Sequence, residues 1–139
     1  MKRLHVHLAV TDLAEASGFY TTLFGTPPSV AKHDYAKWLI DDPRVNFVIS
    51  SRRRPTGLDH LGIQVDSGDE LEEVAERLAT GVATVEQPKA HCCYAASDKV
   101  WATDPAGVAW ETFHTYGDRT TYGDDRSPDA HAARSACCA

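Results

Sequence analysis

The stretch His5-Val6-His7-Leu8-Ala9-Val10 recurs later in the chain as His60-Leu61-Gly62-Ile63-Gln64-Val65. In the first copy, alternation places the aliphatic side chains on one face of a strand and both histidines on the other. The two copies begin 60 − 5 = 55 residues apart. Because so short a repeat cannot bury a core of its own, we expect the two halves to pack together as one domain.

Each copy precedes the signals of one helix and then of several strands. The first helix begins at Asp12, which has capping spacing to Glu15, and ends at Gly25. The second begins at Ser67, which has the same spacing to Glu70. Strand-like stretches follow the first helix at about residues 29–34, 35–40 and 45–50, and the second at about 82–86, 92–96, 99–103 and 108–114.

These signals predict an α+β fold built from two βαβββ modules, about residues 3–50 and 59–115. A connector rich in Arg, Pro and Gly joins them, so residues 1–115 form a single domain. From residue 116 the composition turns polar and loses all periodicity. We therefore expect residues 116–139 to be a flexible C-terminal tail.

Composition excludes two classes of partner. The net charge of -6 argues against nucleic acid, because binding to phosphates needs a clustered positive surface. No apolar stretch approaches the roughly 20 residues that a membrane-spanning helix requires. We expect a cytoplasmic protein without nucleic-acid or membrane partners. We also expect it to be either a monomer or a homodimer.

Two histidines and one glutamate are candidate metal ligands. His5 and His60 begin matching strands, and Glu111 lies on the last strand of the second module. Two imidazoles and one carboxylate form a facial triad that leaves positions open for substrate or oxygen, as in non-haem Fe(II) oxygenases, although zinc and manganese also accept these ligands. His7 is the rival of His5 on the same strand face, and we favour His5 because it aligns with His60.

The four cysteines form two adjacent pairs, Cys92-Cys93 and Cys137-Cys138. Adjacent cysteines close only a strained disulfide ring, so the spacing favours reduced thiols in a reducing compartment. Two neighbouring thiolates can both bind one soft centre, such as trivalent arsenic, Cd(II) or Cu(I).

Three aromatic residues and a lysine near the cysteines are candidates for a substrate pocket. They are Tyr94, Trp101, Trp110 and Lys99. We favour core positions for the tryptophans and a solvent-facing position for Lys99.

With these residues assembled, the chain resembles the vicinal oxygen chelate superfamily, which includes glyoxalase I, extradiol dioxygenases and the bleomycin resistance proteins. The resemblance covers about residues 3–115. It implies two βαβββ modules that form a cupped mixed sheet around a metal, with His5, His60 and Glu111 as the ligands. Fold alone does not fix the reaction.

The stretch from Cys92 to Pro105 is similar to the branch that contains the Fe(II)-dependent carbon-arsenic lyases and the cadmium-induced proteins. This resemblance implies that Cys92 and Cys93 bind a trivalent organoarsenical, methylarsenite or a reduced aromatic arsenical. It also implies that Fe(II) on His5, His60 and Glu111 uses dioxygen to break the carbon-arsenic bond and release arsenite. Zinc, manganese, nickel or cobalt are substitutes for iron.

Two alternatives stay open. The chain could be a thiol-based arsenic- or cadmium-binding resistance protein without catalysis. It could also be a glyoxalase-like or extradiol-dioxygenase-like metalloenzyme that acts on a carbon substrate, which gives the cysteine pair no task.

Overall fold

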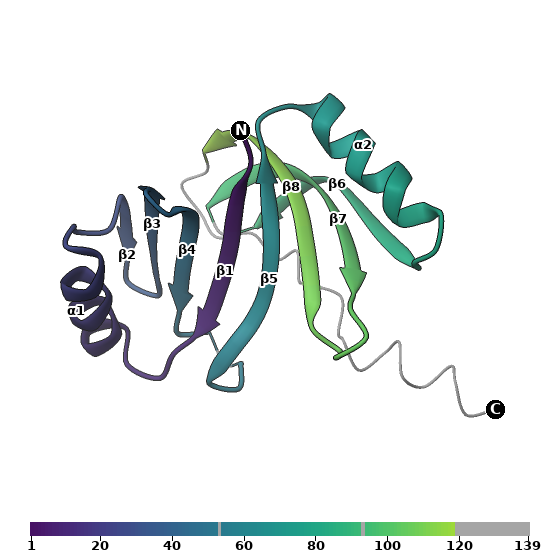
Figure 1. Ribbon diagram of the computed structural model, residues 1–139. Helices are drawn as coiled ribbons and strands as arrows, with labels where there is room; N and C mark the ends of the chain where they lie inside the picture. The colour runs from purple at the N-terminus through teal and green to yellow at the C-terminus, as the bar shows by residue number, and fades with distance from the viewer. Residues whose placement is uncertain (53, 93, 119–139) are drawn as a thin grey trace. The chain divides into compact units, whose positions relative to one another are not determined.

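Each half of the chain folds in the order strand, helix and three further strands (Figure 1). The structure, a computed structural model, describes residues 1–52, 54–92 and 94–118. The described chain divides into two compact units, and the division falls inside one strand, between Leu61 and Gly62. The N-terminal unit is Arg3–Leu61, and the C-terminal unit begins at Gly62 and includes Met1 and Lys2. The predicted α+β class is confirmed.

The N-terminal unit holds the first module and the start of the next strand. Its elements are β1 (Arg3–Ala9), α1 (Leu13–Phe24), β2 (Val30–Lys32), β3 (Tyr35–Asp41), β4 (Arg44–Ser50) and the first residues of β5 (Gly57–Val65). The strand order is β2-β3-β4-β1-β5. Because β1 pairs with β4 in parallel while β3 pairs with β4 antiparallel, the sheet is mixed.

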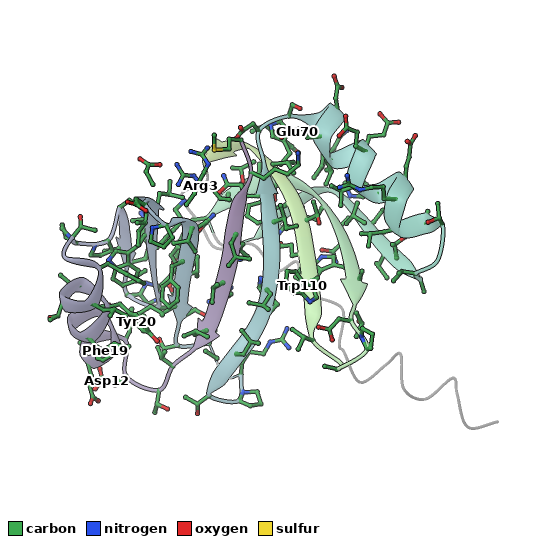
Figure 2. All side chains as sticks on the ribbon, in the orientation of Figure 1. Arg3, Asp12, Phe19, Tyr20, Glu70 and Trp110 are labelled. Atoms are coloured by element: carbon green, nitrogen blue, oxygen red, sulfur yellow. The ribbon has the colours of Figure 1, made fainter. Side chains whose placement is uncertain are left out.

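Helix α1 begins and ends at the residues expected from the sequence. The Asp12 side chain accepts a hydrogen bond from the backbone N–H of Glu15 at 2.9 Å, and Gly25 ends the helix with a left-handed φ of 68°. Tyr20 packs toward the sheet, with its ring centroid 4.5 Å from that of Phe47. Phe19, the residue before Tyr20 in the helix, is 62% exposed (Figure 2).

The two faces of β1 serve different purposes. Val6 and Leu8 pack in the cluster formed by α1, β3 and β4. His5 and His7 point to the opposite face and are nevertheless buried. The predicted alternation is therefore correct, and it places two imidazoles on a buried face that α1 does not cover.

The C-terminal unit repeats the arrangement. It contains the end of β5, then α2 (Gly68–Ala79), β6 (Thr84–Cys92), β7 (Ala95–Thr103) and β8 (Ala109–Asp118). The strand order is β5-β8-β7-β6, with antiparallel pairing from β8 to β6. Its core is centred on Val65, Leu71 and Val100. The side chain of Ser67 caps α2 by accepting from the N–H of Glu70 at 3.2 Å.

The four strands predicted after α2 are wrong in number, because the structure has three. The stretch around Pro88 is a bulge within the continuous strand β6, which lies at the end of the strand order, where proline is tolerated. Asp98, which resembles a turn residue, lies inside β7. Its carboxylate accepts the N–H of Lys89 at 2.7 Å, so it stabilises the bulge.

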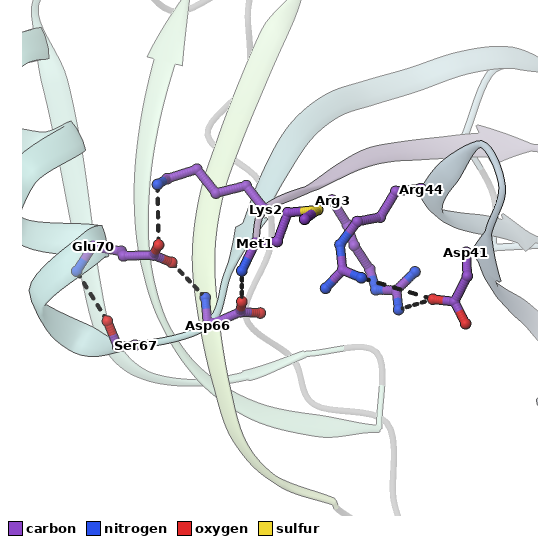
Figure 3. A network of polar contacts seen from close by, with 8 residues as sticks. All are labelled: Met1, Lys2, Arg3, Asp41, Arg44, Asp66, Ser67 and Glu70. Atoms are coloured by element: carbon purple, nitrogen blue, oxygen red, sulfur yellow. Dashed lines mark hydrogen bonds and ion pairs between the residues drawn. The ribbon is translucent and has the colours of Figure 1, made fainter.

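Polar contacts fasten the start of the chain (Figure 3). In the C-terminal unit, the N-terminal ammonium of Met1 pairs with Asp66, and Lys2 Nζ lies 3.2 Å from Glu70 Oε1. In the N-terminal unit, Arg3 pairs with Asp41. Such exposed pairs contribute little stability individually.

Two expectations concern the chain's ends and membranes. Strand β8 runs to Asp118, into the segment expected as tail, and the rest of that tail with Cys137-Cys138 lies outside the described residues. Neither helix in the described part of the chain is long and apolar enough to cross a membrane.

Gly62 on β5 generates a stability prediction. A Cβ placed there would lie 2.2 Å from the backbone oxygen of Glu111, so β5 and β8 approach too closely for any side chain. We expect Gly62→Ala to lower the free energy of unfolding by about 1–3 kcal/mol, measured by urea denaturation.

Gly18→Ala is the matched control. A Cβ at Gly18, inside α1, would meet nothing within 4 Å. This variant should gain about 0.5–1 kcal/mol from the lower entropy of its unfolded state. Equal effects of the two substitutions would contradict the close approach.

Candidate metal centre

The two predicted histidines of the N-terminal unit lie together. His5 on β1 and His60 on β5 are each 5% exposed, and their Nε2 atoms are 3.2 Å apart. Their ring planes are tilted by 48°, so the rings meet at their nitrogen edges rather than stacking face to face.

Hydrogen bonds fix which nitrogen of each ring carries the proton. His5 Nδ1 lies 3.0 Å from the backbone oxygen of Asn46, and His60 Nδ1 lies 2.7 Å from Asp59 Oδ1. A carbonyl and a carboxylate can only accept, so both Nδ1 atoms donate. In the neutral rings, each Nε2 therefore presents its lone pair toward the other.

This arrangement fits a divalent metal ion. Two lone pairs facing each other at 3.2 Å repel unless a cation or a proton lies between them. Two nitrogen ligands bound at about 2.1 Å and at about 90° to each other lie about 3 Å apart, close to the observed separation. Metal-bound histidines also characteristically donate their other N–H to a carbonyl or carboxylate, as both do here.

His7 lies beside the two predicted histidine ligands. One potential ligand atom from each of His5, His7 and His60 lies within 4.8 Å of the other two. His7 Nε2 contacts Ser50 Oγ at 2.8 Å. The repeat makes His7 an alternative to His5, whereas the structure brings both to His60. Their spacing of two residues along one strand was the signal that both share a face.

Asp59 provides negative charge beside the imidazoles. Burial alone would raise the pKa of its carboxyl, but the hydrogen bond from His60 and the nearby guanidinium of Arg54 hold that pKa below its ordinary value. Arg54 Nε lies 3.6 Å from Asp59 Oδ2. The carboxylate therefore stays ionised and continues to orient His60.

Glu111, the predicted acidic ligand, lies on β8 in the C-terminal unit and is buried. Its carboxylate forms an ion pair with Lys99 of β7. Trp101 is opposite Glu111 and Lys99 is opposite Phe113, which makes Lys99 and Glu111 diagonal neighbours. The expectation of a solvent-facing Lys99 is wrong, because Lys99 is only 6% exposed. The Glu111 carboxylate compensates its buried positive charge.

Of the predicted cysteine pair, the structure describes only the backbone of Cys92, at the end of β6. Cys92 is the last residue of β6 and pairs with Ala95, the first residue of β7. Tyr94, the residue before β7, has a left-handed φ of 62°. Cys93 lies outside the described residues, so the thiolate pair stays a prediction.

The tryptophans of the C-terminal unit have structural partners. Trp101 is 4% exposed and its indole N–H donates to Gln87 Oε1 at 2.9 Å, as expected of a core residue. Trp110 is half-buried, and its N–H donates to Asp104 Oδ2 at 3.1 Å (Figure 2 labels Trp110). Backbone and indole hydrogen bonds to Asp104 hold the pKa of that carboxyl below its ordinary value.

The βαβββ modules and the buried histidines define a class of protein. The model of the Glyoxalase/Bleomycin resistance protein/Dioxygenase superfamily matches residues 2–112, and the chain belongs to this superfamily. Its fold is also that of the Mn(II)-bound glyoxalase of Novosphingobium aromaticivorans, with a TM-score of 0.61 at 16% identity over 91% of this chain and 44% of that one. Homoprotocatechuate 2,3-dioxygenase of Brevibacterium fuscum gives a TM-score of 0.62 at 18% identity over 96% and 40%. The predicted vicinal oxygen chelate fold is confirmed.

Relatives of higher identity have more specific names. The chain is 40% identical to a trivalent organoarsenical cleaving enzyme of Thermomonospora curvata, over 99% of this chain and 89% of the relative. It is 41% identical to a protein of the same name from a Bacillus species, over 83% and 74%. The cadmium-induced protein of Mycobacterium bovis is 34% identical over 99% and 93%.

The contact between His60 and Asp59 generates a prediction about metal affinity. Asn can still accept from His60 Nδ1, but it has no charge to strengthen the bond. We expect Asp59→Asn to weaken metal binding by about 10- to 100-fold, measured by equilibrium dialysis with Co(II).

Asp41→Asn is the control, since Asp41 also pairs with an arginine of the same unit but is 81% exposed. It should leave the affinity unchanged. An equal loss in both variants would mean that general charge, rather than the orientation of His60, controls binding.

Proposed function

We propose that this protein is a dioxygen-dependent, non-haem Fe(II) lyase that breaks the carbon-arsenic bond of trivalent organoarsenicals and releases arsenite. Methylarsenite and reduced aromatic arsenicals are the proposed substrates, and detoxification is the proposed role. One observation carries the proposal. A buried imidazole pair with Nε2 atoms 3.2 Å apart occurs in a chain 40% identical, over 99% of its length, to a trivalent organoarsenical cleaving enzyme.

In this proposal, His5, His60 and Glu111 hold the metal. Iron, when bound, supplies the redox chemistry that activates dioxygen. Glu111 supplies a hard oxygen ligand, which suits Fe(II) and Mn(II) better than nitrogen ligands alone. Zinc, manganese, nickel and cobalt would occupy the same ligands as substitutes.

Lys99 has a supporting role. An ammonium beside the Glu111 carboxylate favours its ionised form, which is the form that binds a metal. Both side chains are buried, so the attraction is only weakly screened by salt. Lys99 thus keeps a buried carboxylate charged before any metal arrives.

Cys92 and Cys93 bind the substrate in this proposal. Trivalent arsenic is soft and prefers two thiolates to nitrogen or oxygen ligands. Held by two sulfur atoms, an organoarsenical loses its freedom to rotate and diffuse, so the orientation of its carbon-arsenic bond is restricted before reaction. Adjacent reduced cysteines also suit the reducing cytoplasm, where we place the activity.

A second candidate function is sequestration without catalysis. The 34% identity to a cadmium-induced protein over 99% of this chain favours it. Both functions need Cys92 and Cys93, but only the lyase needs the metal ligands together with iron and dioxygen. A glyoxalase or extradiol dioxygenase would need the metal ligands and leave the cysteines without a role.

Reconstitution separates the lyase from sequestration. Protein loaded with Fe(II) without oxygen, then exposed to air and methylarsenite, should release arsenite, measured by arsenic speciation. Zn(II)-loaded protein is the control, since zinc has no redox chemistry. Equal release by metal-free protein would contradict the proposed mechanism.

Single substitutions test the thiolate site. Cys92→Ser and Cys93→Ser should each weaken methylarsenite binding by at least about 100-fold, because the second sulfur no longer adds its effective concentration. Metal content should stay normal. The double variant Cys137→Ser/Cys138→Ser is the matched control and should bind as the unmodified protein does. Full affinity in both single variants would remove Cys92 and Cys93 from the site.

A further inference from the structure

We propose that His7 is a metal ligand, and that His5, His7 and His60 together form a three-imidazole site that binds a divalent ion without Glu111. The ions expected to use it are those that favour nitrogen ligands, namely zinc, cobalt and nickel. The site lies wholly within the N-terminal unit. It adds a ligand to the centre of the proposed enzyme, but it does not depend on any arsenical chemistry.

The geometry of the three rings supports the proposal. The centroid of His7 lies 4.8 Å from that of His60 and 6.2 Å from that of His5. One nitrogen from each ring lies within 4.8 Å of the others, which is close enough for the three side chains to be candidate ligands of one ion. All three side chains are buried, which limits competition from water.

The proton on His7 can adapt to a metal. Its Nε2 contacts Ser50 Oγ at 2.8 Å. A hydroxyl can either donate or accept, so this contact is compatible with a proton on either ring nitrogen. When Ser50 accepts from Nε2, the lone pair of His7 lies on Nδ1. His5 and His60 lack this choice, because their partners only accept.

Charge also distinguishes this site from one that includes Glu111. The Glu111 carboxylate is already paired with Lys99, so a metal that recruits Glu111 must compete with a buried ammonium. Three neutral imidazoles need no such exchange. The Asp59 side chain lies 2.7 Å from His60 Nδ1 and so gives that ring the outer hydrogen-bond acceptor typical of metal-bound histidines. Three histidines with one open position are an established zinc geometry.

The test measures Co(II) binding in the full chain with all four cysteines changed to serine, so that thiolates cannot bind the ion. Equilibrium dialysis and visible absorption give stoichiometry and affinity. In this background, Glu111→Ala should still bind one Co(II) per chain. Loss of a residue that only hydrogen-bonds to a metal ligand weakens binding by up to about 100-fold. Adding His7→Phe should weaken Co(II) binding by more than that, because it removes a ligand.

Two controls keep the result interpretable. His33→Phe removes an exposed histidine of the same unit and should leave affinity unchanged. The metal-free His7→Phe protein must keep its unfolding midpoint, so that lost affinity cannot be due to lost stability. If the midpoint falls, proton NMR of the Co(II)-bound Glu111→Ala protein counts the bound imidazoles without removing His7. Three Co(II)-shifted imidazole N–H resonances are expected.

Two outcomes would overturn the proposal. One is loss of stoichiometric Co(II) both from Glu111→Ala and from the double variant Lys99→Met/Glu111→Ala, which leaves no buried charge without its partner. The other is the presence of only two shifted imidazole resonances. Neither measurement uses arsenic or dioxygen, so failure here leaves the proposed lyase function to its own tests.

Discussion

Two hydrogen bonds, from His5 Nδ1 to a backbone carbonyl and from His60 Nδ1 to Asp59, determine what the candidate centre can do. They place both lone pairs on the Nε2 atoms, and the pairing of the strands brings those atoms to 3.2 Å. Without the acceptors, either ring could turn its protonated nitrogen inward and bind no metal. The apolar cluster formed by α1, β3 and β4 packs against the other face of β1, so the imidazoles point away from it.

The buried pair of Lys99 and Glu111 imposes a second constraint. Removing one partner alone would leave an uncompensated charge in the C-terminal unit, so each partner stabilises the other whether or not a metal is present. Lys99 favours the ionised form of Glu111, which is the form that binds a metal, but it also pairs with the carboxylate oxygen that a metal would need. In the proposed centre, an ion that prefers oxygen ligands would have to compete with Lys99 for the Glu111 carboxylate.

Sequence predicted the features that follow from local periodicity and capping. The alternation of β1, the caps at Asp12 and Ser67 and the βαβββ order each need only neighbouring residues to be read. It failed where pairing between strands decides. Lys99 is buried because β8 places a glutamate diagonally across from it, and Pro88 is tolerated because Asp98 on β7 stabilises the bulge. The residue pattern of one strand does not show which side chains the neighbouring strand places beside it.

His7 is the most instructive residue, because the repeat that identified His5 and His60 also argued against it. Its equivalent in the second copy is Gly62, where the backbone of β8 leaves no room for a side chain. The two positions are thus equivalent in sequence but not in surroundings: β8 approaches one, while Ser50 receives the imidazole of the other. A duplicated module can acquire a new ligand only at the copy where the neighbouring strand leaves space. Repeat symmetry therefore predicts ligands that both copies share, and departures from that symmetry, such as His7 opposite Gly62, are where we propose that this chain gains a metal preference of its own.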